Sequence, residues 1–240
     1  MRKSIAAAVL AASAATSSCG QFHSDVGKTV SRNYQVGNFQ EVVAAGPYDI
    51  NVQTGANPSV SAQGPEKVLD HVKVEVEGDK LVIRSENRGI FSWSWGSHER
   101  TVFNVTVPQL RAATLAGSGD LSINNVSGDS FEGTLAGSGD LSVGSVKVKS
   151  LKIGLAGAGD AKVGGGQADT AEYKTVGAGD IDARNVTTQQ LKISIAGSGD
   201  IKGHATATAD VSIMGSGDIE LTGGAKCNVS KMGSGTANCS

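Results

Sequence analysis

The chain has 240 residues, 33 of them glycine, a formal net charge of −2 at pH 7, and only 4% aromatic residues. This charge argues against nucleic acid as a partner, because binding a polyanion needs a basic surface. The high glycine content, together with many Val, Ile and Thr residues, argues against a helical enzyme and favours strands joined by turns. We therefore expect an all-β protein.

The first residues predict export. They read MRKSIAAAVLAASAATSSCG, with Arg2 and Lys3 before an alanine-rich run that is too short to cross a bilayer as a stable helix. This pattern predicts a signal peptide over residues 1–19 and places the protein in the periplasm or at the outer membrane or cell surface. Cys19 is a candidate lipidation site, the alternative being that it is removed with the peptide. A lipid on Cys19 is the only membrane contact that we expect.

A tetrapeptide, Gly-Ser-Gly-Asp or Gly-Ala-Gly-Asp, recurs from residue 117 onward. Its aspartates are 20 residues apart in the first four steps and 18 in the next, and a final copy has Thr236 in place of aspartate. A fixed period of this length is typical of a solenoid, in which each repeat buries its apolar face by stacking on its neighbours. The aspartates are Asp120, Asp140, Asp160, Asp180, Asp200 and Asp218.

Apolar residues alternate with polar ones on both sides of each tetrapeptide, which indicates a strand on each side. Before the corner the apolar positions include Leu135 and Leu155, and after it Leu121 and Leu141. Each coil of about 20 residues is thus predicted to hold two strands, one glycine corner and a second turn of variable length. We predict a parallel β-helix, or β-solenoid, over residues 111–240.

The corner residues have predicted structural roles. Glycine adopts positive φ angles without steric cost, and an aspartate can accept hydrogen bonds from the backbone of its own turn. A column of carboxylates also suggests calcium binding, but the calcium-binding nonapeptide solenoid has a nine-residue period and a residue between its last glycine and the aspartate, and this chain has neither. We therefore expect turn capping and no cofactor, and keep a calcium-stabilised solenoid as the alternative.

Cys227 and Cys239 occupy inward positions of the last repeat, on two strands joined by one corner. A disulfide between them would staple the end of the solenoid. Free thiols or a metal pair are the weaker alternatives, since two cysteines alone make a poor metal site.

The front half is also predicted to be β-structure. Residues 20–34 are assigned to a linker and residues 35–110 to an N-terminal β region, in which Gly78-Asp79 separates two alternating runs as a hairpin would. These strands form either a capping sheet or the first, irregular coils of the solenoid. The sequence leaves both arrangements open.

Aromatic residues alternate in the segment NRGIFSWSWGSHER, where Phe91, Trp93 and Trp95 stand beside Arg88, His98 and Arg100. Such residues form a candidate binding site for a sugar or a partner surface. The alternative is a hairpin whose aromatic side chains cover one end of the core.

The segments VGNFQEVVAAGPYDINVQTG and VTVPQLRAATLAGSGDL, followed by the train of Gly-Ser/Ala-Gly-Asp corners, resemble a bacterial family. This family is described as "putative auto-transporter adhesin, head GIN domain" (DUF2807), and the resemblance covers roughly residues 35 to 225. It implies an exported β-solenoid, often attached to the envelope by a lipid, with an adhesin role. No catalytic residues come with the family.

The function predicted is that of a non-enzymatic envelope or surface protein that acts as an adhesin, scaffold or binding module. Its partner would be an envelope or extracellular glycan or protein, and its open end could form a homodimer. The alternative is a polysaccharide-active β-helix enzyme. We expect no catalytic residues and no metal site, because the histidines show no metal-ligand spacing: His23, His71, His98 and His204.

Overall fold

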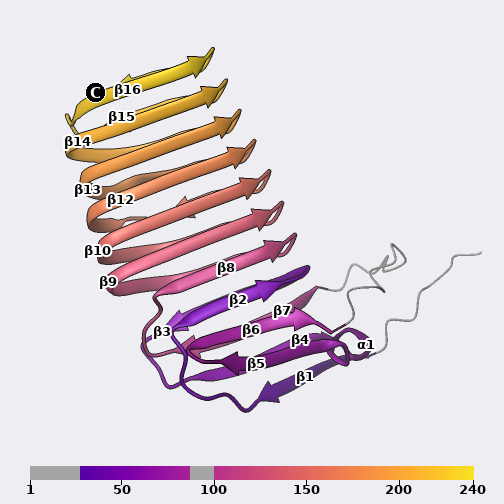
Figure 1. Cartoon of the computed structure of the whole chain (residues 1–240). Helices are drawn as coiled ribbons and strands as arrows, with labels where there is room; N and C mark the ends of the chain where they lie inside the picture. The colour runs from indigo at the N-terminus through magenta and orange to yellow at the C-terminus, as the bar shows by residue number, and fades with distance from the viewer. Residues whose placement is uncertain (1–27, 87–99) are drawn as a thin grey trace, which may run out of the picture.

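The computed structural model describes residues 28–86 and 100–240. They form a β-solenoid of about six turns, as predicted, whose coils stack along one axis (Figure 1). Its one helix in these ranges is the short α1 (Glu66–Leu69). The strands are β1 (Thr29–Tyr34), β2 (Glu41–Ala45), β3 (Tyr48–Thr54), β4 (Ser59–Pro65), β5 (Val72–Glu77), β6 (Lys80–Ser85), β7 (Thr101–Val107), β8 (Ala112–Gly117), β9 (Leu121–Gly137), β10 (Leu141–Gly157), β11 (Ala161–Val163), β12 (Gly166–Gly177), β13 (Ile181–Gly197), β14 (Ile201–Gly215), β15 (Ile219–Thr222), β16 (Lys226–Gly233) and β17 (Ala237–Cys239).

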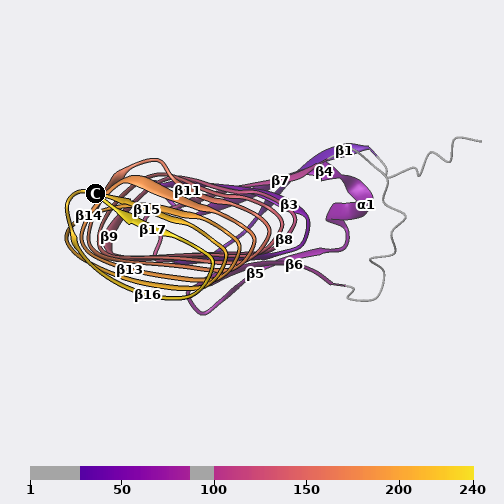
Figure 2. The same cartoon turned by 90° about the horizontal axis from the view of Figure 1, so that it is seen from above.

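The solenoid has two walls that face each other across the core, as the view along its axis shows (Figure 2). The pre-corner wall consists of the segments that lead into the glycine corners, and the post-corner wall of those that leave them. Within each wall, neighbouring coils pair in parallel and in register, for example Leu151 with Phe131 and Leu141 with Leu121. Alternate residues point inward, so that identical positions of successive coils form the buried columns that the repeat predicts.

The coils of β11–β12 and β15–β16 have the predicted two strands with a turn between them, whereas other coils have one continuous strand. In β9, β10 and β13 one strand of 17 residues runs from one corner to the next and bends between the walls while its pairing continues. The bend contributes further buried positions that the repeat pattern did not predict: Val126, Val146 and Val186 share one register position, and Val148, Ala168, Thr188 and Ala205 share another. The shorter 18-residue spacing is absorbed at this bend, where the register between β13 and β14 shifts.

The two glycines of a corner are required for different reasons, although the sequence predicted the same role, positive φ, for both. The first glycine has positive φ, for example +136° at Gly157. The second, such as Gly159, does not; a Cβ atom there would lie 1.8 Å from the carbonyl oxygen of Gly139 in the preceding coil. Successive corners therefore pack backbone against backbone, and only glycine fits.

The corner aspartates form a ladder along the solenoid. Each Oδ1 accepts a hydrogen bond from the backbone N–H of the aspartate in the next coil, over 2.7–3.1 Å. At the last corner, Asp218 Oδ1 accepts from both the N–H and the Oγ1 of Thr236 at 2.8 Å. The expected bond within the same turn is thus replaced by a bond to the neighbouring coil, which ties each corner to the next.

The ladder begins earlier than the repeat indicates. β2 and β3 form a complete coil whose corner reads Gly46-Pro47-Tyr48-Asp49, and Asp49 Oδ1 accepts from the N–H of Asp120. β6 and β7 pair in parallel with β2 and β3, which makes them part of the stack. Residues 55–111 are therefore inserted between two adjacent coils.

The remaining N-terminal strands cap this end of the stack. β5 pairs antiparallel with β6, and β4 pairs antiparallel with both β7 and β1. Both arrangements left open by the sequence are thus present, irregular coils and a capping sheet. The predicted linker over residues 20–34 extends too far, because residues 29–34 form β1.

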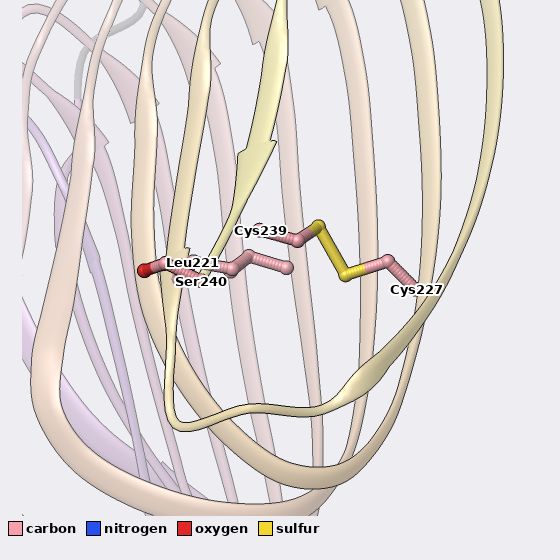
Figure 3. Close-up of a disulfide and its surroundings, with 4 residues drawn as sticks. All are labelled: Leu221, Cys227, Cys239 and Ser240. Atoms are coloured by element: carbon pink, nitrogen blue, oxygen red, sulfur yellow. A yellow bond between two sulfur atoms is a disulfide. The ribbon is translucent and has the colours of Figure 1, made fainter.

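At the other end, the last coil is closed by a disulfide. Cys227 on β16 and Cys239 on β17 are joined across the interior (Figure 3). Lys231 takes the register position of Ile213, an inward position in the coil before it, and its Nζ donates to the Gly235 carbonyl oxygen at 3.1 Å. In the last coil, a disulfide and a charged lysine therefore take inward positions that apolar side chains fill in the coil before it.

Replacing Gly159 by alanine is expected to lower the free energy of unfolding by about 1 to 3 kcal/mol, the usual cost of overpacking, because the new methyl group meets the Gly139 carbonyl. Gly154→Ala is the matched control, since its Cβ would meet only Thr134 Oγ1 at 3.8 Å. Thermal or denaturant unfolding of both variants measures the difference. Equal stabilities would show that the corners do not depend on this contact.

Hydrogen bonds from Thr236 hold the pKa of Asp218 below its ordinary value of 3.8. A carboxyl group with a lowered folded pKa stabilises the fold above its unfolded pKa, and this contribution is lost as the pH falls through the folded pKa. Thr236→Val should raise the pKa of Asp218 in an NMR titration. The pKa of Asp129, which Lys149 lowers, should stay unchanged as the internal control. An unmoved Asp218 would contradict the assignment.

Reduction of the Cys227–Cys239 disulfide should destabilise the last coil by about 3 kcal/mol, as expected for a loop of this length in the chain-entropy account. Amide hydrogen exchange should accelerate in β16 and β17 before it does so in β9 and β10. A Cys227→Ser/Cys239→Ser variant should show the same exchange with and without reductant. Unchanged exchange on reduction of the natural chain would argue against a stabilising role.

Candidate functional site

The structure places only some of the residues that the sequence singled out. Phe91, Trp93 and Trp95 fall in residues 87–99, and Cys19 in residues 1–27, all outside the described ranges. The corner aspartates stand in one line along an edge of the solenoid. At its first two positions, Arg100 Nη1 lies 3.3 Å from Asp49 Oδ2 and 3.5 Å from Asp120 Oδ2.

Over residues 28–86 and 100–240, no three His, Cys, Asp or Glu side chains are grouped so as to hold a metal ion. Two of the four histidines are described, and they lie apart in the fold. His71 lies between α1 and β5, and His204 lies on β14, where its Nδ1 is 2.9 Å from Thr222 Oγ1. No helix in the described part of the chain is long and apolar enough to cross a membrane.

Polar side chains form two neighbouring columns on the outer face of the pre-corner wall. Because residues two apart on a strand share a face, each coil contributes one residue to each column. The hydroxyl column, named for its mainly hydroxyl side chains, consists of Ser130, Ser150, Thr170, Gln190 and Thr208. The charged column consists of Glu132, Lys152, Glu172, Lys192 and Asp210.

These two columns line an open groove that we call the pre-corner groove. One hollow of about 370 Å³ lies over residues 150–210, and a second of about 320 Å³ extends it toward Glu41 and Arg111. The two hollows share Ser150 and Lys152, so the groove continues over successive coils. Stacking in register therefore builds a long linear surface from one short sequence pattern.

An ion-paired cluster stands at the N-terminal end of the groove. Glu41 accepts from Arg111 Nη2 at 3.1 Å and lies 3.1 Å from Lys80 Nζ, and Arg111 also pairs with Asp79. At the other end, Asn228 Nδ2 donates to Asp210 Oδ1 at 3.3 Å. Ion pairs thus flank the groove at its N-terminal end, and a hydrogen bond holds the last residue of the charged column.

Charges alternate in sign along the outer columns. In register, like charges on neighbouring strands would repel, whereas opposite charges attract. The same alternation occurs in the post-corner wall from Lys162 through Asp182 and Lys202 to Glu220. Hydrogen bonds from Arg184 lower the pKa of Asp182. These columns are thus compatible with close stacking.

Another outer column of the pre-corner wall is apolar. It runs in register from β2 to β16 and is made of Ala45, Ala116, Ala136, Ala156, Val176, Ala196, Met214 and Met232. Its largest side chains lie at the C-terminal end, where Met214 is 60% and Met232 71% exposed. The wall thus carries a polar groove and an apolar line, with one further outer column between them.

Several of these outer lysines and acids can be identified from the sequence, but the groove cannot. Alternation shows which residues point outward, and the fixed period shows which of them share a column. The two signals together predict the charge alternation. The repeat pattern places the columns but does not show that a hollow lies over them.

Comparison with known proteins relates the whole stack to one family. Residues 38–225 match the family model described as "Putative auto-transporter adhesin, head GIN domain". Among curated proteins, none matches the chain.

Solved structures share the fold at low sequence identity. One called a putative adhesin, from Bacteroides fragilis NCTC 9343, is 24% identical, with a TM-score of 0.78 over 88% of this chain and 97% of its own. A second, called a putative lipid binding protein, from Parabacteroides distasonis ATCC 8503, is 24% identical, with a TM-score of 0.72 over 89% and 97%. A third, called a putative adhesin, from Parabacteroides merdae ATCC 43184, is 18% identical, with a TM-score of 0.70 over 89% and 97%.

The family match spans both the irregular first coils and the regular repeats, which this structure shows to be one continuous stack. The chain belongs to the head GIN domain family of auto-transporter adhesin-like proteins.

Proposed function

We propose that this protein is a non-enzymatic adhesin of the bacterial envelope, which binds its target with the outer face of the solenoid. The observation that carries the proposal is the pre-corner wall, where exposed polar columns run in register over consecutive coils. Continuous ladders and backbone contacts between corners hold the backbone of these columns in place, so little backbone entropy is lost when they bind.

The family description and the names of two of the similar structures support an adhesin role. The predicted signal peptide supports export, with Cys19 as the proposed lipid attachment site that would keep the solenoid at the envelope. The proposed partner is a glycan or protein of the envelope or the extracellular matrix.

A second candidate function is contact with lipid. The apolar column supports it, since Met214 and Met232 are largely exposed, and one structure with the same fold is named a putative lipid binding protein. Flotation with phospholipid vesicles tests this candidate. Binding that is lost in Met214→Ser/Met232→Ser would favour it over the adhesin proposal.

The adhesin proposal predicts saturable binding of the purified chain to at least one immobilised envelope polymer, host glycan or matrix protein. Binding should be the same in calcium and in EDTA, because we assign the aspartate ladder to bonds between coils. The heat-unfolded chain is the control and should not bind. Failure to bind any target would contradict the proposal. Cleavage of a bound polysaccharide would favour the alternative enzyme, and loss of binding in EDTA would revive the calcium-stabilised solenoid.

A further inference from the structure

The pre-corner groove has the form of a site for a linear ligand. It is long and open, and it crosses the strands, so a ligand lying in it meets one residue of each column at every coil. The coils are spaced by about 4.8 Å, the distance between paired strands. A linear polymer of similar repeat length would therefore make contacts that recur along the stack of coils.

The hydroxyl column has unused hydrogen-bonding groups. Among its five side chains, Thr170 alone has a side-chain bond within residues 28–86 and 100–240, from its Oγ1 to the Lys149 carbonyl oxygen at 3.4 Å. Serine, threonine and glutamine side chains can each donate and accept. They match ligand hydroxyl groups, which also do both.

The charged column supplies strong donors and acceptors in alternation. Lys152 has no ion-pair partner in the described residues, and Lys192 approaches Glu172 only at 4.0 Å. Lysine donates and a carboxylate accepts, and hydrogen bonds to charged groups are stronger than those between neutral groups. Lysine and carboxylate side chains can therefore both bind a ligand hydroxyl group. The hydroxyl group accepts a hydrogen bond from lysine in one coil and donates one to a carboxylate in the next.

The charge of the groove argues against a strongly charged ligand. Lys152 and Lys192 are flanked by Glu132, Glu172 and Asp210, so a polyanion or a polycation would meet a like charge at every second coil. Such repulsion is a common source of specificity. A neutral ligand rich in hydroxyl groups meets no such penalty.

We infer that the pre-corner groove binds a neutral, linear polysaccharide lying across the coils with about one sugar ring per coil. A pyranose ring in an extended chain is about as long as the coil spacing of ~4.8 Å, so one ring lies over each coil. Where successive rings are turned over, equivalent hydroxyl groups recur at every second coil, as do the like charges of the charged column. This inference rests on the proposed adhesin function and specifies its ligand class. The affinity is the sum of many weak contacts repeated along the stack.

The test uses the purified full chain and neutral linear oligosaccharides of two to eight sugars from gluco-, manno- and xylo-series, in calorimetric titrations. Affinity should rise with each added sugar and level off at about five or six, when the oligomer spans the coils of the groove. Hexagalacturonate and the hexamer of glucosamine, the charged probes, should bind at least about tenfold more weakly. In NMR spectra, the neutral hexamer should shift amide signals of Thr170 and Gln190.

Variants on the two walls separate the groove from the rest of the surface. Lys152→Ala/Lys192→Ala should weaken hexamer binding about tenfold or more, because two charged donors are lost. Lys162→Ala/Lys202→Ala removes the same number of lysines from an alternating column of the post-corner wall and should change the affinity less than about twofold. Circular dichroism and Tm of both variants check that the solenoid is intact, and the NMR shifts on the natural chain locate the site independently.

Three results would overturn the inference. These are no binding of any neutral oligomer, binding that does not depend on oligomer length, and equal effects of the two double variants. A preference for a charged probe would overturn the neutral ligand class. If the chain still binds immobilised envelope or matrix targets, the adhesin proposal stands while the groove assignment fails, and if it binds nothing, both fail.

Discussion

The whole stack depends on the contact between successive corners. A Cβ atom on the second glycine of the corner would lie 1.7–2.2 Å from a backbone oxygen of the neighbouring corner at every copy from Gly119 to Gly235. Real atoms cannot approach so closely, so each of these positions must be glycine if the coils are to lie at strand spacing. Backbone contact at one corner of every coil also fixes the register, since a slip of one residue would bring a side chain into the contact and turn the core residues outward.

Perfect register creates an electrostatic problem that the chain solves in two ways. Identical positions of successive coils lie about 4.8 Å apart, where two like charges repel by roughly 0.9 kcal/mol even in water. On the walls, alternation of lysine with glutamate or aspartate removes the repulsion. At the corners, aspartate recurs in every coil but the last. Each of these carboxylates accepts a hydrogen bond from the backbone N–H of the next coil. The repulsion is offset by a charge-assisted hydrogen bond at each step.

The regular coils are well predicted from the sequence because their determinants are local and repeated. Period, glycine corners and inward columns all follow from residues within one coil and the next. The first corner cannot be recognised from the repeat because Tyr48 replaces the second glycine, and the ring of Tyr48 takes the space beside Gly46. The pairing of β3 with β9 is equally hidden, since residues 55–111 separate neighbouring coils and only the folded chain shows that they touch. The groove is hidden as well, because alternation and period place its columns but do not show the hollow over them.

The ends of the stack limit the length over which the proposed ligand could contact the groove. At one end, Glu41 and Arg111 form an ion pair with each other. At the other, Lys231 stands where an apolar residue would be needed to continue the core, and a further coil would have to bury its charge. The same lysine argues against a homodimer formed by stacking two solenoids end to end. A solenoid whose ends resist extension keeps its columns at a fixed number of coils, so the length of these columns is determined by its own sequence.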